Sequence, residues 1–193
     1  MSALILGLLM FLGMHSARIV AEGWRTQVIA QRGPNAWKGL YTVVSLVGFG
    51  LILWGYGQAR LEPVVLWATP LWTRHLAALL VLLALVLLAA AYVPGNGIKA
   101  RVHHPMVLGV KVWALAHLLA NNTLADLLLF GSFLVWAVLD FRSSRQRDRA
   151  AGTVYPPGSA GRTVATVVLG VVLWALFAFW LHGLLFGVRP FGR

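Results

Sequence analysis

The sequence contains no cysteine among its 193 residues. This absence excludes disulfide bonds, iron–sulfur clusters, thiolate ligation of a metal, a cysteine nucleophile and the C-x-x-C-H motif of covalently attached haem. Any transition metal or haem in this protein would therefore depend on nitrogen or oxygen ligands, and six histidines are present.

Charged residues are also scarce, acidic ones above all. Only 11% of the residues are charged, with 16 Lys and Arg against 5 Asp and Glu, whereas 60% are apolar. A soluble domain carries roughly 25% charged residues because water must solvate its surface. The composition therefore predicts an all-α, polytopic integral membrane helical bundle with the lipid bilayer as its main partner. The net charge of +11 then belongs to helix ends that face lipid headgroups, and no nucleic-acid partner is indicated.

Six apolar segments are long enough, or nearly so, to cross a bilayer, which takes about 20 residues. We predict about six transmembrane helices in a single domain, residues 1–193, with the first segment a retained helix and not a signal peptide. The third segment is almost pure Leu, Val and Ala, and we expect it to face lipid as the outer wall. The predicted spans are residues 3–20, 40–59, 76–93, 106–120, 124–141 and 164–188.

The connections on one side of the predicted bundle are polar and basic. Residues 21–39 form an amphipathic connection that Gly33-Pro34 interrupts, residues 94–105 form a Gly- and Pro-rich turn, and residues 142–163 form the longest polar loop. This side carries eleven Lys and Arg, and the opposite side carries four. Because short basic loops stay in the cytoplasm, we expect the loop 142–163 to be cytoplasmic.

Several ionisable residues lie inside the predicted spans, where each is costly and is therefore a functional candidate. His15 lies in the first span, Lys111 and His117 lie in the fourth, and His104 stands at the entry of the fourth. The alternative is structural, since a histidine within a span can simply hydrogen-bond a neighbouring helix, and a lysine can extend to the interface. Histidine is, however, the side chain best suited to ligate haem iron when no thiolate is available.

Two histidines on different helices can hold one haem between them. His104 and His117 are 13 residues apart, which places them about 140° apart around one helix axis. They cannot both reach one iron from the same side. The residues alone leave open which of the two would pair with His15.

A longer pattern surrounds these histidines. Residues 104–138, HPMVLGVKVWALAHLLANNTLADLLLFGSFLVWAV, together with Met14-His15-Ser16, resemble the NnrU family of bacterial membrane proteins. The resemblance implies a multi-pass protein of the bacterial inner membrane that is associated with denitrification and nitric oxide metabolism. The family is also related to the 15-cis-zeta-carotene isomerase of plants and cyanobacteria, which holds a b-type haem through two histidines.

Carried over by position, that ligand pair falls on His15 and His117, and His104 matches another family histidine. In the predicted topology the two ligands differ in depth by roughly 10 Å. Either the first helix is tilted or longer than predicted, or His104 is the partner of His15, and we prefer His117. For the haem propionates or another polar site we expect Arg18, one turn from His15 on the same face, and Lys111.

Three functions are compatible with this pattern. The first is a membrane protein that binds haem b and supports denitrification or nitric oxide metabolism, with a gaseous or hydrophobic small molecule as its ligand. The second is a haem-dependent, redox-gated cis–trans isomerase of a carotenoid. The third is a cofactor-free transporter or assembly factor. No acid/base dyad, nucleophile or nucleotide motif decides whether the protein is an enzyme, and the sequence indicates no particular protein partner.

Overall fold

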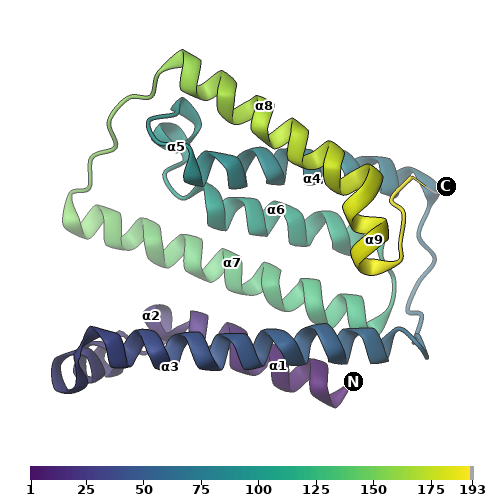
Figure 1. The fold of residues 1–193 in the computed structure, drawn as a ribbon, viewed down its shortest axis with the longest axis horizontal. Coiled ribbons are helices and arrows are strands. Elements are labelled where there is room, and N and C mark those ends of the chain that lie inside the picture. Colours follow the sequence, from purple (N-terminus) through teal and green to yellow (C-terminus); the bar gives the residue numbers. More distant parts are fainter. Residues whose placement is uncertain (192–193) are drawn as a thin grey trace. The chain divides into compact units, whose positions relative to one another are not determined.

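The structure, a computed structural model, describes residues 1–191 and is helical apart from turns and connecting segments (Figure 1). Among these residues there is no β-strand, and two isolated bridges are the only β-pairing. The elements in chain order are α1 (Ser2–His15), α2 (Ala17–Val20), α3 (Glu22–Ala59), α4 (Leu71–Tyr92), α5 (Gly97–Val102), α6 (Pro105–Ala120), α7 (Leu124–Ala151), α8 (Ala160–Leu176), the π-helix η1 (Phe177–Leu181) and α9 (His182–Phe186).

Four helical stretches are long and apolar enough to cross a membrane. They are α3, α4, α7 and the stretch Ala160–Phe186, which joins α8, η1 and α9. The apolar helices α1 and α6 are shorter, at 14 and 16 residues. These six correspond to the six predicted spans, and the predicted class, an all-α membrane bundle, is confirmed.

The chain divides into two compact units. The first contains Met1–Trp67 and Asn122–Asp140, and the second contains Ala68–Asn121 and the chain from Phe141 onward. The long helix α7 contributes its first part to one unit and its last part to the other.

In the first unit, α1 packs along the second half of α3 with backbone almost touching backbone. A Cβ atom added at Gly55 would lie 2.3 Å from the Leu4 nitrogen, and one added at Gly7 would lie 2.7 Å from the Ile52 nitrogen. Such small residues allow close helix packing where no water is present to drive association. The register of α1 on α3, and with it the position of His15, therefore depends on these glycines.

In the second unit, α4 lies between α6 and α8. On one side a Cβ at Gly109 of α6 would lie 3.0 Å from the Ala84 carbonyl oxygen, and on the other a Cβ at Gly170 of α8 would lie 2.6 Å from the Val86 Cα. The expectation that this helix is the outer wall holds only for part of its surface, because protein covers two of its sides. Its alanines allow close contact on two sides, while larger side chains such as Leu79 and Leu83 remain exposed, as Val164 and Val168 of α8 are.

The connection 21–39 is helical, which differs from the prediction of a polar linker. Residues 22–32 form a first arm of α3, and the chain turns at Gly33, whose φ of +81° suits glycine. Pro34 then begins the second arm, where its fixed φ is favourable and its missing N–H is not needed. The break was predicted correctly, but helix continues on both of its sides.

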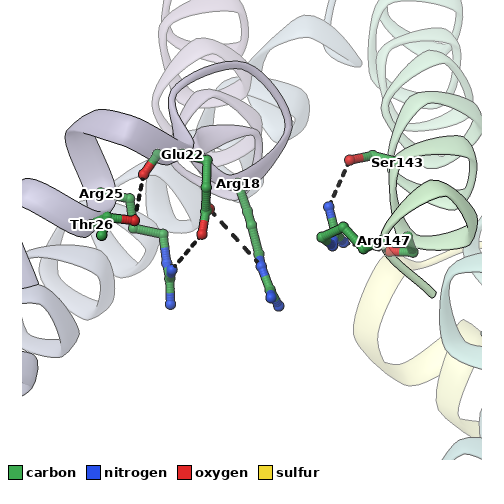
Figure 2. Close-up of polar contacts among 7 residues, drawn as sticks. Arg18, Glu22, Arg25, Thr26, Ser143 and Arg147 are labelled. Atoms are coloured by element: carbon green, nitrogen blue, oxygen red, sulfur yellow. Dashed lines mark hydrogen bonds and ion pairs between the residues drawn. The ribbon is translucent and has the colours of Figure 1, made fainter. Parts of the chain in front are cut away.

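The predicted loop 142–163 is also largely helical, because α7 continues to Ala151. Arginine, glutamine and alanine are good helix formers. The guanidinium of Arg147 also donates to Ser143 Oγ at 2.6 Å, one turn back along the helix (Figure 2). It donates to Ser144 Oγ at 2.7 Å as well. The connection that remains is short and spans residues 152–159. The turn predicted at 94–105 likewise contains the short helix α5.

Candidate functional site

His15 is the last residue of α1 and lies in an aromatic environment within the first unit. Its Nδ1–H donates to the Phe11 carbonyl oxygen at 2.7 Å, since a carbonyl can only accept. Its ring stacks on Phe11, with centroids 4.1 Å apart, and lies 5.0 Å from the ring of Tyr41 and 6.0 Å, edge-on, from that of Trp136. In a neutral ring this arrangement places the proton on Nδ1 and leaves the lone pair on Nε2.

Trp136 adds a second polar feature to the same environment. Its indole nitrogen Nε1 is buried and has no hydrogen-bond partner among the described residues. Buried donors are rarely left without an acceptor, so each exception needs an explanation. An acceptor atom on a group bound beside His15 would supply one. The sequence reasoning missed Trp136, although it lies within the stretch 104–138 that carries the family resemblance.

His117 repeats the arrangement of His15 in the second unit. In α6 its Nδ1–H donates to the Trp113 carbonyl oxygen at 2.8 Å, again four residues back, and the two rings lie 5.0 Å apart. The Asn121 side chain donates to the His117 carbonyl oxygen at 2.8 Å and so closes the end of this helix. Both predicted ligands therefore have the same tautomer, fixed by the same local bond.

His104 has a different environment at the start of α6. Its Nε2 bonds the Asp148 carboxylate at 2.7 Å, and the Tyr155 hydroxyl donates to the same Asp148 oxygen at 2.9 Å. His103, in the left-handed region with φ +68°, stacks on Tyr155 at 4.1 Å and contacts Arg145. Burial, together with the hydrogen bond to Asp148, raises the pKa of the Tyr155 hydroxyl. The ring nitrogen of His104 that usually binds metal is thus already engaged by a carboxylate.

The two expected propionate contacts have protein partners of their own. The Nε of Arg18, in α2, lies 4.0 Å from a Glu22 carboxylate oxygen, and Glu22 also pairs with Arg25 at 2.9 Å (Figure 2). The Lys111 ammonium lies 5.5 Å above the centre of the Phe141 ring. The structure assigns His15 and Arg18 to the first unit, and His104, Lys111 and His117 to the second. The role of Arg18 and Lys111 stays a prediction.

Asp126 is a further ionisable residue of the first unit that the sequence reasoning did not single out. It is buried, accepts a hydrogen bond from the Tyr56 hydroxyl at 2.5 Å, and exchanges hydrogen bonds with Thr123 at the start of α7. This is the capping pattern in which a threonine and an acidic residue three positions later satisfy the first turn of a helix. The T-x-x-D spacing of residues 123–126 was the signal for it.

No group of three or more His, Asp or Glu within residues 1–191 is arranged to hold a metal ion. Haem iron has a lower requirement, because the porphyrin supplies four ligands and the protein supplies only the axial ones. The candidate residues therefore belong to two histidine environments, one in each unit.

Comparison with known proteins identifies the family but not a characterised relative. No curated protein and no solved structure matches the chain. The family described as NnrU protein matches residues 3–190, which is nearly the whole chain and includes both units. The chain therefore belongs to the NnrU family.

Proposed function

We propose that this NnrU-family membrane protein binds haem b, with His15 and His117 as the axial ligands, and serves nitric oxide metabolism or denitrification in the bacterial inner membrane. The observation that carries the proposal is the hydrogen bond that both histidines share. In each, Nδ1–H donates to the carbonyl oxygen four residues earlier, at 2.7 Å for His15 and 2.8 Å for His117.

This bond is the kind of support that a histidine ligand of a metal requires. A ligating histidine usually donates its other ring N–H to a carbonyl or carboxylate, which fixes the ring orientation and makes the ligating nitrogen more basic. Two histidines inside apolar helices carry a free-energy cost in a bilayer that a function must offset. Because His15 and His117 both have this supporting hydrogen bond, they fit the role of metal ligands better than that of incidental polar residues.

The bonds of His104 favour His117 as the second ligand. The Nε2 of His104 already bonds Asp148 at 2.7 Å, and breaking that bond would leave a partly buried carboxylate without one of its partners. We therefore assign His104 to the polar cluster at the end of α7 and keep the His15–His117 pair.

The surroundings of His15 fit a flat, largely apolar group. Three aromatic side chains, Phe11, Tyr41 and Trp136, lie within ring-contact distance of its imidazole. The buried Trp136 N–H provides a donor for one polar atom, and Arg18 and Lys111 are proposed to contact the propionates. Bound haem would supply an iron that changes oxidation state and binds diatomic gases.

The haem content of purified variants tests the proposal. Full-length protein from haem-replete cells should contain one haem b per chain, and His15→Ala and His117→Ala should each lose most of it. His182→Ala is the matched control, because the His182 Nδ1 also bonds a carbonyl oxygen, that of Val188, but outside the candidate site. Protein without haem, or unchanged haem content in both ligand variants, would refute the proposal. The ferrous wild type should also show a shifted Soret band on addition of nitric oxide.

A further inference from the structure

The sharp turn of α3 creates a cavity that the proposed haem site does not use. The two arms, residues 22–32 and 34–59, meet at Gly33 and fold against each other. Trp24 of the first arm contacts Trp37 of the second edge-on at 5.4 Å, and the Arg25 guanidinium lies 5.8 Å above the Trp37 ring. A cavity of about 290 Å³ lies beside this contact, and we call it the elbow pocket.

One face of the first arm forms most of the elbow pocket. Its lining side chains lie at positions 0, 3, 4, 7 and 8 along the helix, the spacing of a single helical face, and one side chain of the second arm completes it. The face is mixed in character, with apolar groups beside amides and a guanidinium. The lining residues are Trp24, Gln27, Val28, Gln31, Arg32 and Leu40.

The charge in the elbow pocket is not neutralised by the protein. Glu22 is the one acidic residue within residues 17–39, and it pairs with Arg18 and Arg25 (Figure 2). Within the part of the chain that the structure describes, no ion pair involves Arg32. The guanidinium at the pocket wall therefore requires an anion from outside the chain or water.

The helix around the pocket has the pattern of a segment that leaves a membrane at its headgroups. Leu40 begins the apolar stretch that continues through the second arm, a helix long and apolar enough to cross a membrane. The first arm is amphipathic and carries an exposed tryptophan, a side chain that prefers the membrane–water interface. Basic residues at such a position attract the anionic lipids of the adjacent leaflet.

We propose that the elbow pocket binds the headgroup of an acidic phospholipid. The planar guanidinium of Arg32 matches a phosphate group bidentately, and the amides of Gln27 and Gln31 add neutral donors. Trp24, Val28 and Leu40 contact the glycerol and the first methylenes of the acyl chains. A molecule with a phosphate beside an apolar tail satisfies both halves of this lining, which a soluble anion does not.

Native mass spectrometry tests this proposal by measuring lipid affinity. The delipidated, detergent-solubilised full chain is titrated with phosphatidylglycerol or with phosphatidylcholine. The wild type should bind phosphatidylglycerol more tightly, and Arg32→Gln should weaken the first binding event about tenfold, the loss expected for one charge-assisted pair. Arg32→Lys should give an intermediate affinity. Lys38→Gln is the matched control, because it removes one charge from the same segment but does not line the pocket, and its affinity should stay within about twofold.

A second pair of variants tests the pocket without changing Arg32. Gln27→Glu adds an anion to the lining and should weaken phosphatidylglycerol binding as strongly as Arg32→Gln. Gln58→Glu makes the same change at the other end of α3 and should leave binding unchanged. Equal binding of both lipids by the wild type, equal losses in Arg32→Gln and Lys38→Gln, or full competition by soluble glycerol 3-phosphate would each overturn the proposal.

Discussion

At the scale of single residues, the proposed function depends on which nitrogen of a histidine is engaged. In His15 and His117 the Nδ1 atom bonds a carbonyl oxygen within the same helix, whereas in His104 the Nε2 atom bonds Asp148. One helical turn is enough to build the first arrangement, because residues four apart lie on the same face. The second arrangement needs the end of α7, 44 residues away in sequence.

The same contrast predicts that replacing His104 changes the stability of the protein but not its haem content. We expect His104→Ala to keep the haem content of the wild type, because its ring nitrogen serves Asp148 and not iron. The variant should lower the free energy of unfolding by about 1–3 kcal/mol, since a partly buried carboxylate loses a hydrogen-bond partner. Haem quantification and denaturant unfolding in detergent measure the two effects. His75→Ala, at an exposed position, is the control, and loss of haem in His104→Ala would make His104 the ligand instead.

At the scale of helices, the position of His15 depends on how closely α1 approaches α3. The glycines at positions 7, 48 and 55 lie where an added Cβ would come within 3 Å of backbone atoms of the facing helix. Between apolar helices in lipid, association depends on this kind of packing more than on a hydrophobic driving force. The environment of His15, which Tyr41 of α3 helps to form, should therefore be sensitive to the separation of the two helices.

Gly55→Ala tests this dependence. The new Cβ would lie 2.3 Å from the Leu4 backbone nitrogen, so α1 must shift, and we expect a loss of about 1–3 kcal/mol in stability together with a reduced haem content. Gly50→Ala is the matched control on the same helix, where a Cβ meets nothing within 4 Å. Thermal unfolding in detergent should give a lower melting temperature for Gly55→Ala than for Gly50→Ala. Equal melting temperatures would show that α1 and α3 are not in close contact at Gly55.

The sequence predicted the elements better than their packing. Hydrophobic runs located all six apolar helices, and the glycine and proline at positions 33 and 34 located the break in α3. Hydrophobicity alone could not show that α4 packs between α6 and α8, because a run of Leu, Val and Ala looks the same whether it faces lipid or protein. The small alanines of α4 and the glycines at 109 and 170 were the available signal.

The helical extension of α7 was missed for a related reason. The polarity and charge of residues 142–149 favour a loop, whereas the arginines and the glutamine in this run are good helix formers. The candidate site was predicted only in part. His15 and His117 could be named from position and family resemblance, but Trp136 and the engagement of His104 by Asp148 depend on contacts between distant segments that no local pattern encodes.

At the scale of the whole molecule, the distribution of basic residues predicts an orientation, with the segment 142–163 in the cytoplasm. The absence of cysteine makes this directly measurable, since single cysteines can be introduced without a background. Val154→Cys and Leu61→Cys place a thiol at exposed positions of two connections, 87% and 73% accessible. In intact cells a membrane-impermeant maleimide should label Leu61→Cys and not Val154→Cys, and the reverse pattern would invert the predicted topology.

The axial coordination of the iron is the most direct test of the proposed function, because it separates a ligand from a residue that only supports the fold. The ferric wild type should show the low-spin electron paramagnetic resonance signal of two histidine ligands. The fraction of haem that His117→Gly retains should be high-spin and should return to low-spin when imidazole is added, since the free ligand replaces the missing side chain. A His117→Gly spectrum that is identical to that of the wild type, or that does not respond to imidazole, would contradict ligation by His117.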